Sequence, residues 1–228
     1  MTQGSTRMTA ADLSHIDAWL FDLDHTLYPP ECPLMSMVDA RMDLYVQKVA
    51  GVDAEEAARL RGQYFLDHGT TMAGLIANHE IDPHHYLADV QDVSVDCVTP
   101  DPEMRAGIAR LPGRRLVFTN AGQRYATRVL EKLGVADLFE EVFTIETANF
   151  VPKPQPATFS AIVALHGLEP QVTAFFEDTA RNLEPAAAIG MTTVLVGPDA
   201  LETRHAFVHH RTENLPAFLK TARVKEPS

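Results

Sequence analysis

Two aspartates stand two residues apart at the end of an apolar run, in the segment LFDLDHTLYPP at residues 20–30. Side chains two residues apart on a strand point to the same side, so Asp22 and Asp24 would be aimed into one small volume. Two unit charges about 4 Å apart repel by roughly 4 kcal/mol at an effective dielectric constant near 20. The pair therefore indicates a site in which a cation offsets the charge and the two carboxylates have separate chemical roles.

Five further polar residues follow later apolar runs: Thr119, Asn120, Lys153, Glu177 and Asp178. The carboxyl ends of parallel strands meet at one edge of a sheet, so we expect all these side chains to converge there. Oxygen ligands without histidine or cysteine favour magnesium over zinc. A lysine, a threonine and nearby backbone amides favour an anion of phosphate size. The pattern predicts a magnesium-dependent site for a small phosphorylated metabolite.

The apolar runs that position these residues alternate with helical patterns. The runs are rich in Val, Phe or Leu, as is typical of parallel strands buried on both faces, and lie at residues 18–23, 115–120, 141–146, 173–178 and 192–197. Helical patterns separate the later runs, at residues 123–133, 156–165 and 180–189. This alternation predicts an α/β fold with a Rossmann-like, doubly wound parallel sheet, whose ligands bind beyond the carboxyl ends of the strands.

The stretch from residue 29 to residue 104 breaks this alternation. It contains only helical patterns, at residues 35–50, 53–69, 72–80 and 82–90. Prolines cluster at both of its junctions with the rest of the chain, as expected for hinge-like connections. We expect residues 29–104 to form a helical cap domain, inserted into an α/β core made of residues 1–28 and 105–228.

Four segments resemble the motifs of the haloacid dehalogenase superfamily of phosphatases. FDLDHTL at residues 21–27, VFTN at 117–120, the Lys-Pro pair at 153–154 and EDTARN at 177–182 match the four motifs in the order of the family. The helical insert lies between the first and second motifs, where members with a helical cap carry it. His25 departs from the expected Asn, and Glu177 stands where many members have Gly or Asp, but neither change removes a group that the mechanism needs.

The resemblance implies the roles of the individual residues. Asp22 would be the nucleophile that forms an aspartyl-phosphate, and Asp24 would protonate the leaving alcohol and then activate water. Mg²⁺ would be held by Asp22, the backbone carbonyl of Asp24 and Asp178. We expect Glu177 to be a further metal ligand and Asn182, one helical turn after Asp178, to hold the metal or its water.

The remaining motif residues would act on the substrate. The resemblance implies that Thr119, Asn120 and Lys153 bind the phosphate and stabilise the charge on the transferring phosphoryl group. The activity implied is that of a phosphoric monoester hydrolase.

Part of the cap resembles the pyrimidine 5′-nucleotidases, in TLYP at residues 26–29 and YFLDHGTTMAGLIANHEID at 64–82. This resemblance implies hydrolysis of UMP and CMP to nucleoside and phosphate. The cap residues that we expect to contact the substrate are Tyr28, Arg41, Tyr45, Tyr64, His68 and Thr71.

Other functions of the same superfamily stay open at this point. A phosphatase of another small metabolite, such as a sugar phosphate or phosphoglycolate, and a phosphomutase would share the core residues. A non-enzymatic binding module would be expected to have lost a catalytic group, and none is lost. A dehalogenase would not need Asp24, because halide leaves without a proton, and a phosphonatase would need a cap lysine, for which only Lys48 is present.

Composition narrows the partners and the location. The formal net charge of −12 disfavours nucleic acids and anionic membrane surfaces as partners. No apolar run approaches the length of a transmembrane helix, and residues 1–15 are expected to form a flexible leader. Cys32 and Cys97 form no CxxC pair, which favours reduced thiols and a cytoplasmic protein.

Histidines cluster in two places outside these motifs. His84 and His85 form one pair, and His205, His209 and His210 form a second group, the last two within AFVHHRT at residues 206–212. Alternation of apolar and polar residues in the second segment favours an edge strand over a metal site.

Overall fold

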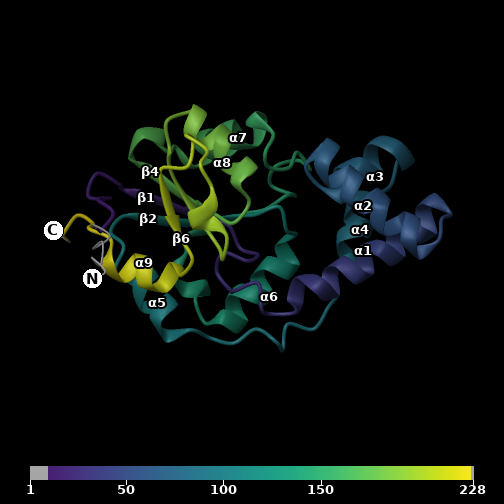
Figure 1. Cartoon of the computed structure of the whole chain (residues 1–228), viewed down its shortest axis with the longest axis horizontal. Helices are drawn as coiled ribbons and strands as arrows, with labels where there is room; N and C mark the ends of the chain where they lie inside the picture. Colours follow the sequence, from purple (N-terminus) through teal and green to yellow (C-terminus); the bar gives the residue numbers. More distant parts are fainter. Residues whose placement is uncertain (1–9, 227–228) are drawn as a thin grey trace, which may run out of the picture.

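The computed structural model describes residues 10–226, which contain one parallel sheet of six strands. The strand order is β3-β2-β1-β4-β5-β6, and the central strands β4, β1 and β2 are labelled in Figure 1. The strands are β1 (Ala18–Phe21), β2 (Arg114–Phe118), β3 (Glu141–Phe143), β4 (Thr173–Glu177), β5 (Thr192–Val196) and β6 (His210–Thr212). The predicted Rossmann-like parallel sheet is confirmed, and the order reverses at β1 and β4, whose ends carry the acidic motif residues.

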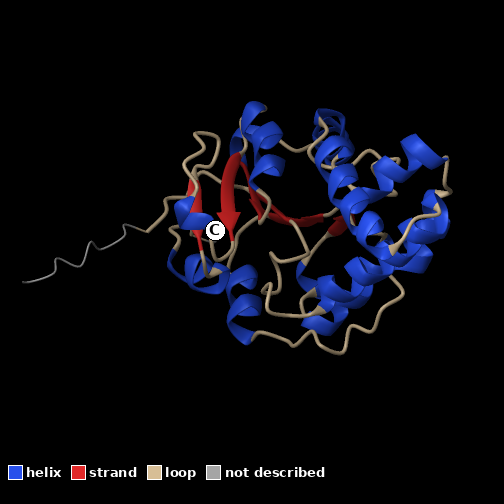
Figure 2. Ribbon diagram, turned by 45° about the vertical axis from the view of Figure 1, so that its right-hand side comes forward, coloured by secondary structure: helices blue, strands red, loops and turns tan. Residues whose placement is uncertain are grey.

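Helices cover both faces of the sheet (Figure 2). They are α5 (Pro102–Ala109), α6 (Gln123–Leu133), α7 (Pro156–His166), α8 (Ala180–Ala188) and α9 (Leu215–Thr221), with short 3₁₀ helices at Ala136–Leu138, Pro170–Val172 and Ala200–Glu202. Alternate residues of β1 serve the two faces: Trp19 and Phe21 pack with the residues of α5, α6 and α9, whereas Leu20 packs with those of α7 and α8. Burial on both faces explains the continuous apolar runs in the sequence.

Four helices form a separate group beside the sheet, seen at the right of Figure 1. They are α1 (Leu34–Ala50), α2 (Ala54–His68), α3 (Thr71–His79) and α4 (Pro83–Val90). Asp53, Thr70 and Asp82 begin the last three helices, since each side chain accepts a hydrogen bond from a backbone N–H of the first turn. The group has its own hydrophobic core around Val46, Leu75 and other buried side chains.

The expected boundary at residue 104 lies inside α5. Gly107 of that helix packs directly on Leu219 of α9, so the whole of α5 belongs with the helices of the sheet. The division into cap and core otherwise stays a prediction.

Two cysteines lie where the helical group joins the sheet. Cys32 precedes α1 and Cys97 lies between α4 and α5, and their sulfur atoms are 3.5 Å apart. Both are free thiols. The two connecting segments therefore run next to each other.

The ends of the described chain differ in part from expectation. Residues 1–9 of the predicted leader lie outside the described residues, but Leu13 is fully buried and its N–H donates to the carbonyl of Arg223. This part of the predicted leader is therefore packed against the C-terminal segment. The segment at residues 206–212 supplies the edge strand β6, although only its last three residues pair. Among residues 10–226, no helix is long and apolar enough to cross a membrane.

Candidate active site

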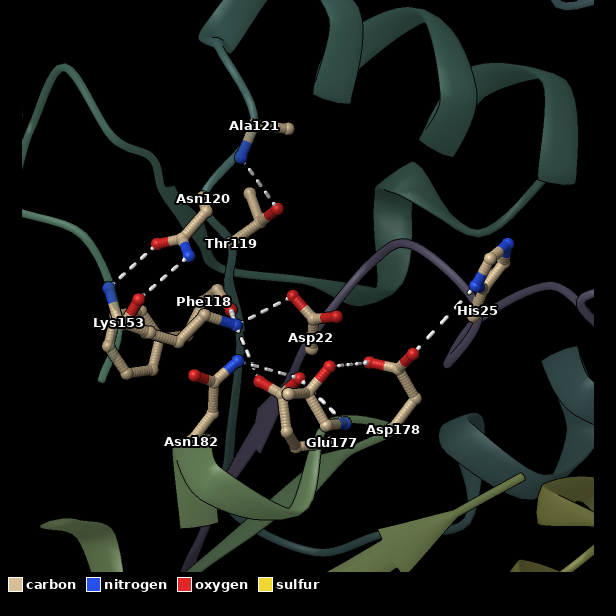
Figure 3. A network of polar contacts seen from close by, with 11 residues as sticks. Asp22, His25, Phe118, Thr119, Asn120, Ala121, Lys153, Glu177, Asp178 and Asn182 are labelled. Atoms are coloured by element: carbon tan, nitrogen blue, oxygen red, sulfur yellow. Dashed lines mark hydrogen bonds and ion pairs between the residues drawn. The ribbon is translucent and has the colours of Figure 1, made fainter. Parts of the chain in front are cut away.

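A buried lysine links two carboxylates at the carboxyl ends of β1 and β4 (Figure 3). The Nζ atom of Lys153 donates to Asp22 Oδ1 and to Glu177 Oε2, both at 2.7 Å, and to the carbonyl oxygen of Phe118 at 2.9 Å. The rings of Phe118 and Phe175 lie 5.1 Å and 5.2 Å from Nζ, so aromatic faces also surround the ammonium group. Lys153 is only 1% exposed, which fixes the cation in one position beside Asp22.

Asn120 holds the backbone of Lys153. Its Oδ1 accepts from the N–H of Lys153 at 2.8 Å, and its Nδ2 donates to the carbonyl oxygen of Lys153 at 3.2 Å. The predicted phosphate-binding Asn120 thus positions the lysine directly. Thr119 Oγ1 accepts from the N–H of Ala121 at 3.0 Å, which leaves the hydroxyl proton of Thr119 available to an anion.

Three carboxylates at this edge lie close enough to share a metal ion. One oxygen each of Asp22, Glu177 and Asp178 lies within 4.8 Å of the others. Asn182 donates from Nδ2 to Glu177 Oε1 at 3.1 Å, whereas its buried Oδ1 has no hydrogen-bond partner among the described residues. An unpaired buried oxygen beside three carboxylates suits Mg²⁺ or a water bound to it, because Mg²⁺ takes oxygen ligands.

Charge is unbalanced in this cluster. Burial, together with Glu177, raises the pKa of Asp22 to about 8, although Lys153 opposes the shift. Burial also raises the pKa of Glu177 to about 7 and that of Asp178 to about 6. Burial alone would lower the pKa of Lys153, but the carboxylates of Asp22 and Glu177 outweigh it and raise that pKa. When all three carboxylates are ionised, they and the one ammonium group leave two negative charges, the amount that a divalent cation offsets.

Two tyrosines hold the second aspartate of the opening pair. Asp24 Oδ1 accepts from the hydroxyl of Tyr28 at 2.5 Å and from that of Tyr125 at 2.9 Å. Burial raises the pKa of Asp24, and these two hydrogen bonds oppose the shift. Tyr125 was not among the residues predicted from the sequence. The sequence signal that could have identified Tyr125 is its place on the first turn of α6, directly after the second motif.

A cavity of about 360 Å³ lies between the strand ends and the helical group. The motif residues Asp22, Asp24, Thr119, Asn120, Lys153, Glu177, Asp178 and Asn182 line its floor. Helices α1 to α4 and their connections line its roof with Met35, Val38, Asp39, Met42, Arg61, Phe65, Thr70, Thr71, Met72, Tyr86, Leu87 and Gln91. All the predicted core residues are therefore brought together around one cavity.

The six residues expected to contact the substrate have different positions. Thr71 lines the cavity. The hydroxyl of Tyr28 donates to Asp24. His68 lies on α2, with the centre of its ring 6.2 Å from that of Tyr64. The other three bond within the helical group, Arg41 to Asp89 at 2.7 Å, Tyr45 to His85 at 3.1 Å and Tyr64 to His79 at 2.9 Å.

Helical periodicity explains which face of α1 lines the cavity. Val38, Asp39 and Met42 lie three, four and seven residues after Met35, so the four share one face of the helix. Arg41 is on another face. Asp39 and Arg61, the charged residues of the roof, were not predicted, and the spacing along α1 was the signal that could have found the first of them.

Comparison with known proteins agrees with this geometry. Residues 16–190 match the family of haloacid dehalogenase-like hydrolases. The chain is 28% identical over 193 residues to "Phosphate metabolism protein 8" of Saccharomyces cerevisiae, a match that covers 78% of this chain and 60% of the yeast protein. It is 26% identical over 208 residues to a phosphoglycolate phosphatase of Chromobacterium violaceum, over 82% of this chain and 87% of that protein.

Among solved structures, a haloacid dehalogenase (HAD) phosphatase from Thermococcus onnurineus has a TM-score of 0.59 at 20% identity, over 92% of this chain and 100% of that one. The order of the four motifs, the parallel sheet and the family match agree. The predicted superfamily is confirmed, and the chain belongs to the haloacid dehalogenase-like hydrolases.

Proposed function

We propose that this protein is a magnesium-dependent phosphomonoester hydrolase that works through a phosphorylated aspartate. The observation that carries the proposal is the position of Asp22 at the floor of the cavity. Its Oδ1 is 2.7 Å from the buried ammonium group of Lys153, and one oxygen each of Asp22, Glu177 and Asp178 lies within 4.8 Å of the others. A carboxylate held in this way faces a cavity large enough for a phosphate ester and is poised to attack phosphorus.

The proposed reaction has two steps. In the first, a carboxylate oxygen of Asp22 forms a bond to phosphorus, the bond from phosphorus to the ester oxygen breaks, and Asp24 gives its proton to the departing alcohol. In the second, Asp24 takes a proton from water, the resulting hydroxide attacks phosphorus, and the phospho-aspartyl bond breaks to release phosphate and restore Asp22. Lys153 and the hydroxyl of Thr119 stabilise the charge on the phosphoryl group.

The oxygens present suit Mg²⁺. We assign Asp22, Asp178 and the backbone carbonyl of Asp24 as its ligands, with the unpaired Oδ1 of Asn182 beside them. When bound, Mg²⁺ would offset the negative charge of the site and polarise the phosphate oxygens. Glu177 already accepts hydrogen bonds from Lys153, Thr179 and Asn182. We therefore assign Glu177 to holding these three groups in place and not to binding the ion.

The proposed substrate is a pyrimidine nucleoside monophosphate. The cavity of about 360 Å³ has an apolar roof that includes Met42, Phe65 and Met72, against which a single ring would pack. The resemblance of residues 64–82 to pyrimidine 5′-nucleotidases supports the same substrate. A cytoplasmic location, which the two free thiols favour, is part of this proposal.

Phosphoglycolate is the second candidate substrate. It is favoured by the 26% identity to a phosphoglycolate phosphatase over most of both chains. Its leaving group carries a carboxylate, whereas a nucleoside is uncharged, so the two candidates make different demands on the roof of the cavity.

A phosphate-release screen tests the proposal. UMP, CMP, AMP, GMP, ribose 5-phosphate and 2-phosphoglycolate would each be assayed with Mg²⁺ and with excess chelator. We expect release that depends on Mg²⁺, and a higher kcat/KM for UMP and CMP than for the purine nucleotides, as the resemblance of residues 64–82 to pyrimidine 5′-nucleotidases implies. Full turnover in chelator would refute the metal assignment. Equal rates with purines would refute the nucleotidase assignment but not the phosphatase one.

A further inference from the structure

The roof of the cavity carries one cation, and carboxylates offset it. Among the described residues that line the roof, the charged ones are Arg61 and Asp39. Arg61 Nη1 lies 3.1 Å from Asp39 Oδ1, and Arg61 Nε donates to Asp43 Oδ1 at 2.6 Å. Two carboxylates therefore surround one guanidinium group, so this part of the cavity has a net negative charge.

A hydroxyl group of the roof has no partner. Tyr86 of α4 lines the cavity and is only 2% exposed, yet its hydroxyl has no hydrogen-bond partner among the described residues. Burial, followed by the Asp39 carboxylate, raises the pKa of Tyr86, so the hydroxyl keeps its proton and can donate. Buried polar groups are nearly always hydrogen-bonded, and an exception in the wall of a cavity points to a ligand that completes it.

We propose that Tyr86 and the Arg61–Asp39 pair form the subsite for the leaving group, and that this subsite takes an uncharged group with hydroxyl or carbonyl oxygens, such as a nucleoside. The proposal rests on the proposed phosphatase function and adds the residues that determine which substrate is accepted. The subsite excludes leaving groups with a carboxylate or a second phosphate.

Charge and hydrogen bonding lead to the same class of leaving group. An anionic leaving group would lose its hydration next to Asp39 and Asp43, where the charge of Arg61 is already offset. An uncharged oxygen can instead accept from the unpaired hydroxyl of Tyr86 and from the guanidinium group of Arg61, both of which line the cavity. The roof therefore favours nucleosides over glycolate.

The first test removes the unpaired hydroxyl. In Tyr86→Phe we expect kcat/KM for UMP to fall about threefold to tenfold, the effect of one neutral hydrogen bond. The kcat/KM for phenyl phosphate should not change, because its leaving group offers no second oxygen. The melting temperature should be unchanged or higher, since the free protein loses only an unpaired buried group.

A matched tyrosine gives the stability control. The hydroxyl of Tyr45 is bonded to His85 at 3.1 Å, so Tyr45→Phe should lower the melting temperature where Tyr86→Phe does not. A fall in kcat/KM of Tyr86→Phe that is equal for UMP and phenyl phosphate would overturn the proposal. A melting temperature lowered as much as in Tyr45→Phe would also overturn it, because the hydroxyl would then have a partner within the protein.

The second test changes the charge. The wild-type protein should prefer UMP to 2-phosphoglycolate, and Asp39→Asn should raise the ratio of kcat/KM for 2-phosphoglycolate to that for UMP by about tenfold, as expected for one charge at close range. Asp89→Asn is the control, since Asp89 pairs with Arg41 outside the cavity. A wild-type preference for 2-phosphoglycolate would overturn this proposal and leave the phosphatase function intact. Absence of turnover with every ester would instead refute the proposed function itself.

Discussion

The guanidinium group of Arg181 lies 3.9 Å from the centre of the Phe65 ring, and this contact joins α8 of the sheet domain to α2 of the helical group. Arg181 also donates to the carbonyl oxygens of Phe65 at 2.7 Å and Gly69 at 3.0 Å. A cation at the C-terminal end of a helix is favourable, because the last carbonyl groups lack partners within the helix. Arg181 therefore holds the roof of the cavity over its floor.

Loss of this contact should weaken catalysis without affecting the catalytic groups. In Arg181→Ala we expect kcat/KM to fall about tenfold or more, since hydrogen bonds from a charged donor contribute about 1.5–3 kcal/mol. Hydrogen exchange at residues 65–69 should become faster. The control is Arg59→Ala on α2, which removes only an exposed pair with Glu56. Unchanged exchange in Arg181→Ala would show that the contact does not hold the roof.

Substitutions of the two aspartates of the first motif should impair different steps of the reaction. Asp22→Asn should be inactive with every ester and never carry covalent phosphate, because an amide cannot replace the attacking carboxylate. Asp24→Asn should lose about 10² to 10⁴ in turnover, the usual contribution of general acid and base catalysis. It should also accumulate phosphoenzyme with p-nitrophenyl phosphate, whose leaving group needs little protonation.

Intact-protein mass spectrometry after a rapid quench measures both outcomes. Phosphate on Asp22→Asn would rule out Asp22 as the nucleophile. Equal losses in Asp24→Asn with good and poor leaving groups would count against Asp24 as the acid.

The tyrosines that bond to Asp24 should act through it. Tyr28→Phe and Tyr125→Phe each remove one hydrogen bond to Asp24 Oδ1, and we expect a fall in kcat of about threefold to tenfold with alkyl phosphates. The loss should be smaller with p-nitrophenyl phosphate. In the Asp24→Asn background neither substitution should have a further effect, which a double-mutant cycle can measure. Independent, additive losses would mean that the tyrosines serve only the packing of the core.

Stability without metal should depend on pH. The pKa values of Asp22, Glu177 and Asp178 in the folded protein are about 8, 7 and 6, above their ordinary values of 3.8, 4.5 and 3.8. The folded protein thus binds protons that the unfolded chain has released between about pH 4 and pH 8, so the free energy of unfolding falls as pH rises through this window.

Magnesium should oppose this fall. Because Mg²⁺ takes the place of the bound protons, its stabilising effect should be larger at pH 8 than at pH 5, and about 2.7 kcal/mol at 100 times its dissociation constant. Thermal unfolding with and without Mg²⁺ at both pH values measures the difference, and Asp178→Asn should reduce it. An equal shift of the melting temperature at both pH values would contradict the assignment of the metal site.

The sheet and its motif residues could be predicted because local sequence determines them. Strands that are buried on both faces have continuous apolar sequences. The polar residue directly after each such strand must lie at the carboxyl edge of a parallel sheet. Helix α6 was predicted with its observed bounds, since Gly134 ends it in the left-handed conformation at φ 69°. The positions of Asp22 and Asp178 follow from these elements alone, whereas Lys153 lies on the connection between β3 and α7 and is held in place by Asn120.

The roof of the cavity was harder to predict. Whether Arg61 or Arg41 faces the cavity depends on how α1 to α4 pack over the strand ends, which helical periodicity alone does not determine. Each arginine pairs with an aspartate of another helix, and nothing in the sequence distinguishes the pair in the cavity from the pair outside it. The bond from Tyr125 to Asp24 likewise joins residues far apart in the chain, whereas Tyr28 is close to Asp24 in the sequence and could have been found from its spacing.

The closeness of Cys32 and Cys97 has a consequence for how such proteins diversify. Their sulfur atoms lie 3.5 Å apart on the two segments that lead into and out of α1 to α4. An inserted unit whose two ends meet at one place can be exchanged for another without displacing the strands on either side. Under the proposed function, helices α1 to α4 would thus form an interchangeable module, whose exchange would alter the esters that the protein accepts and leave the residues at the strand ends unchanged.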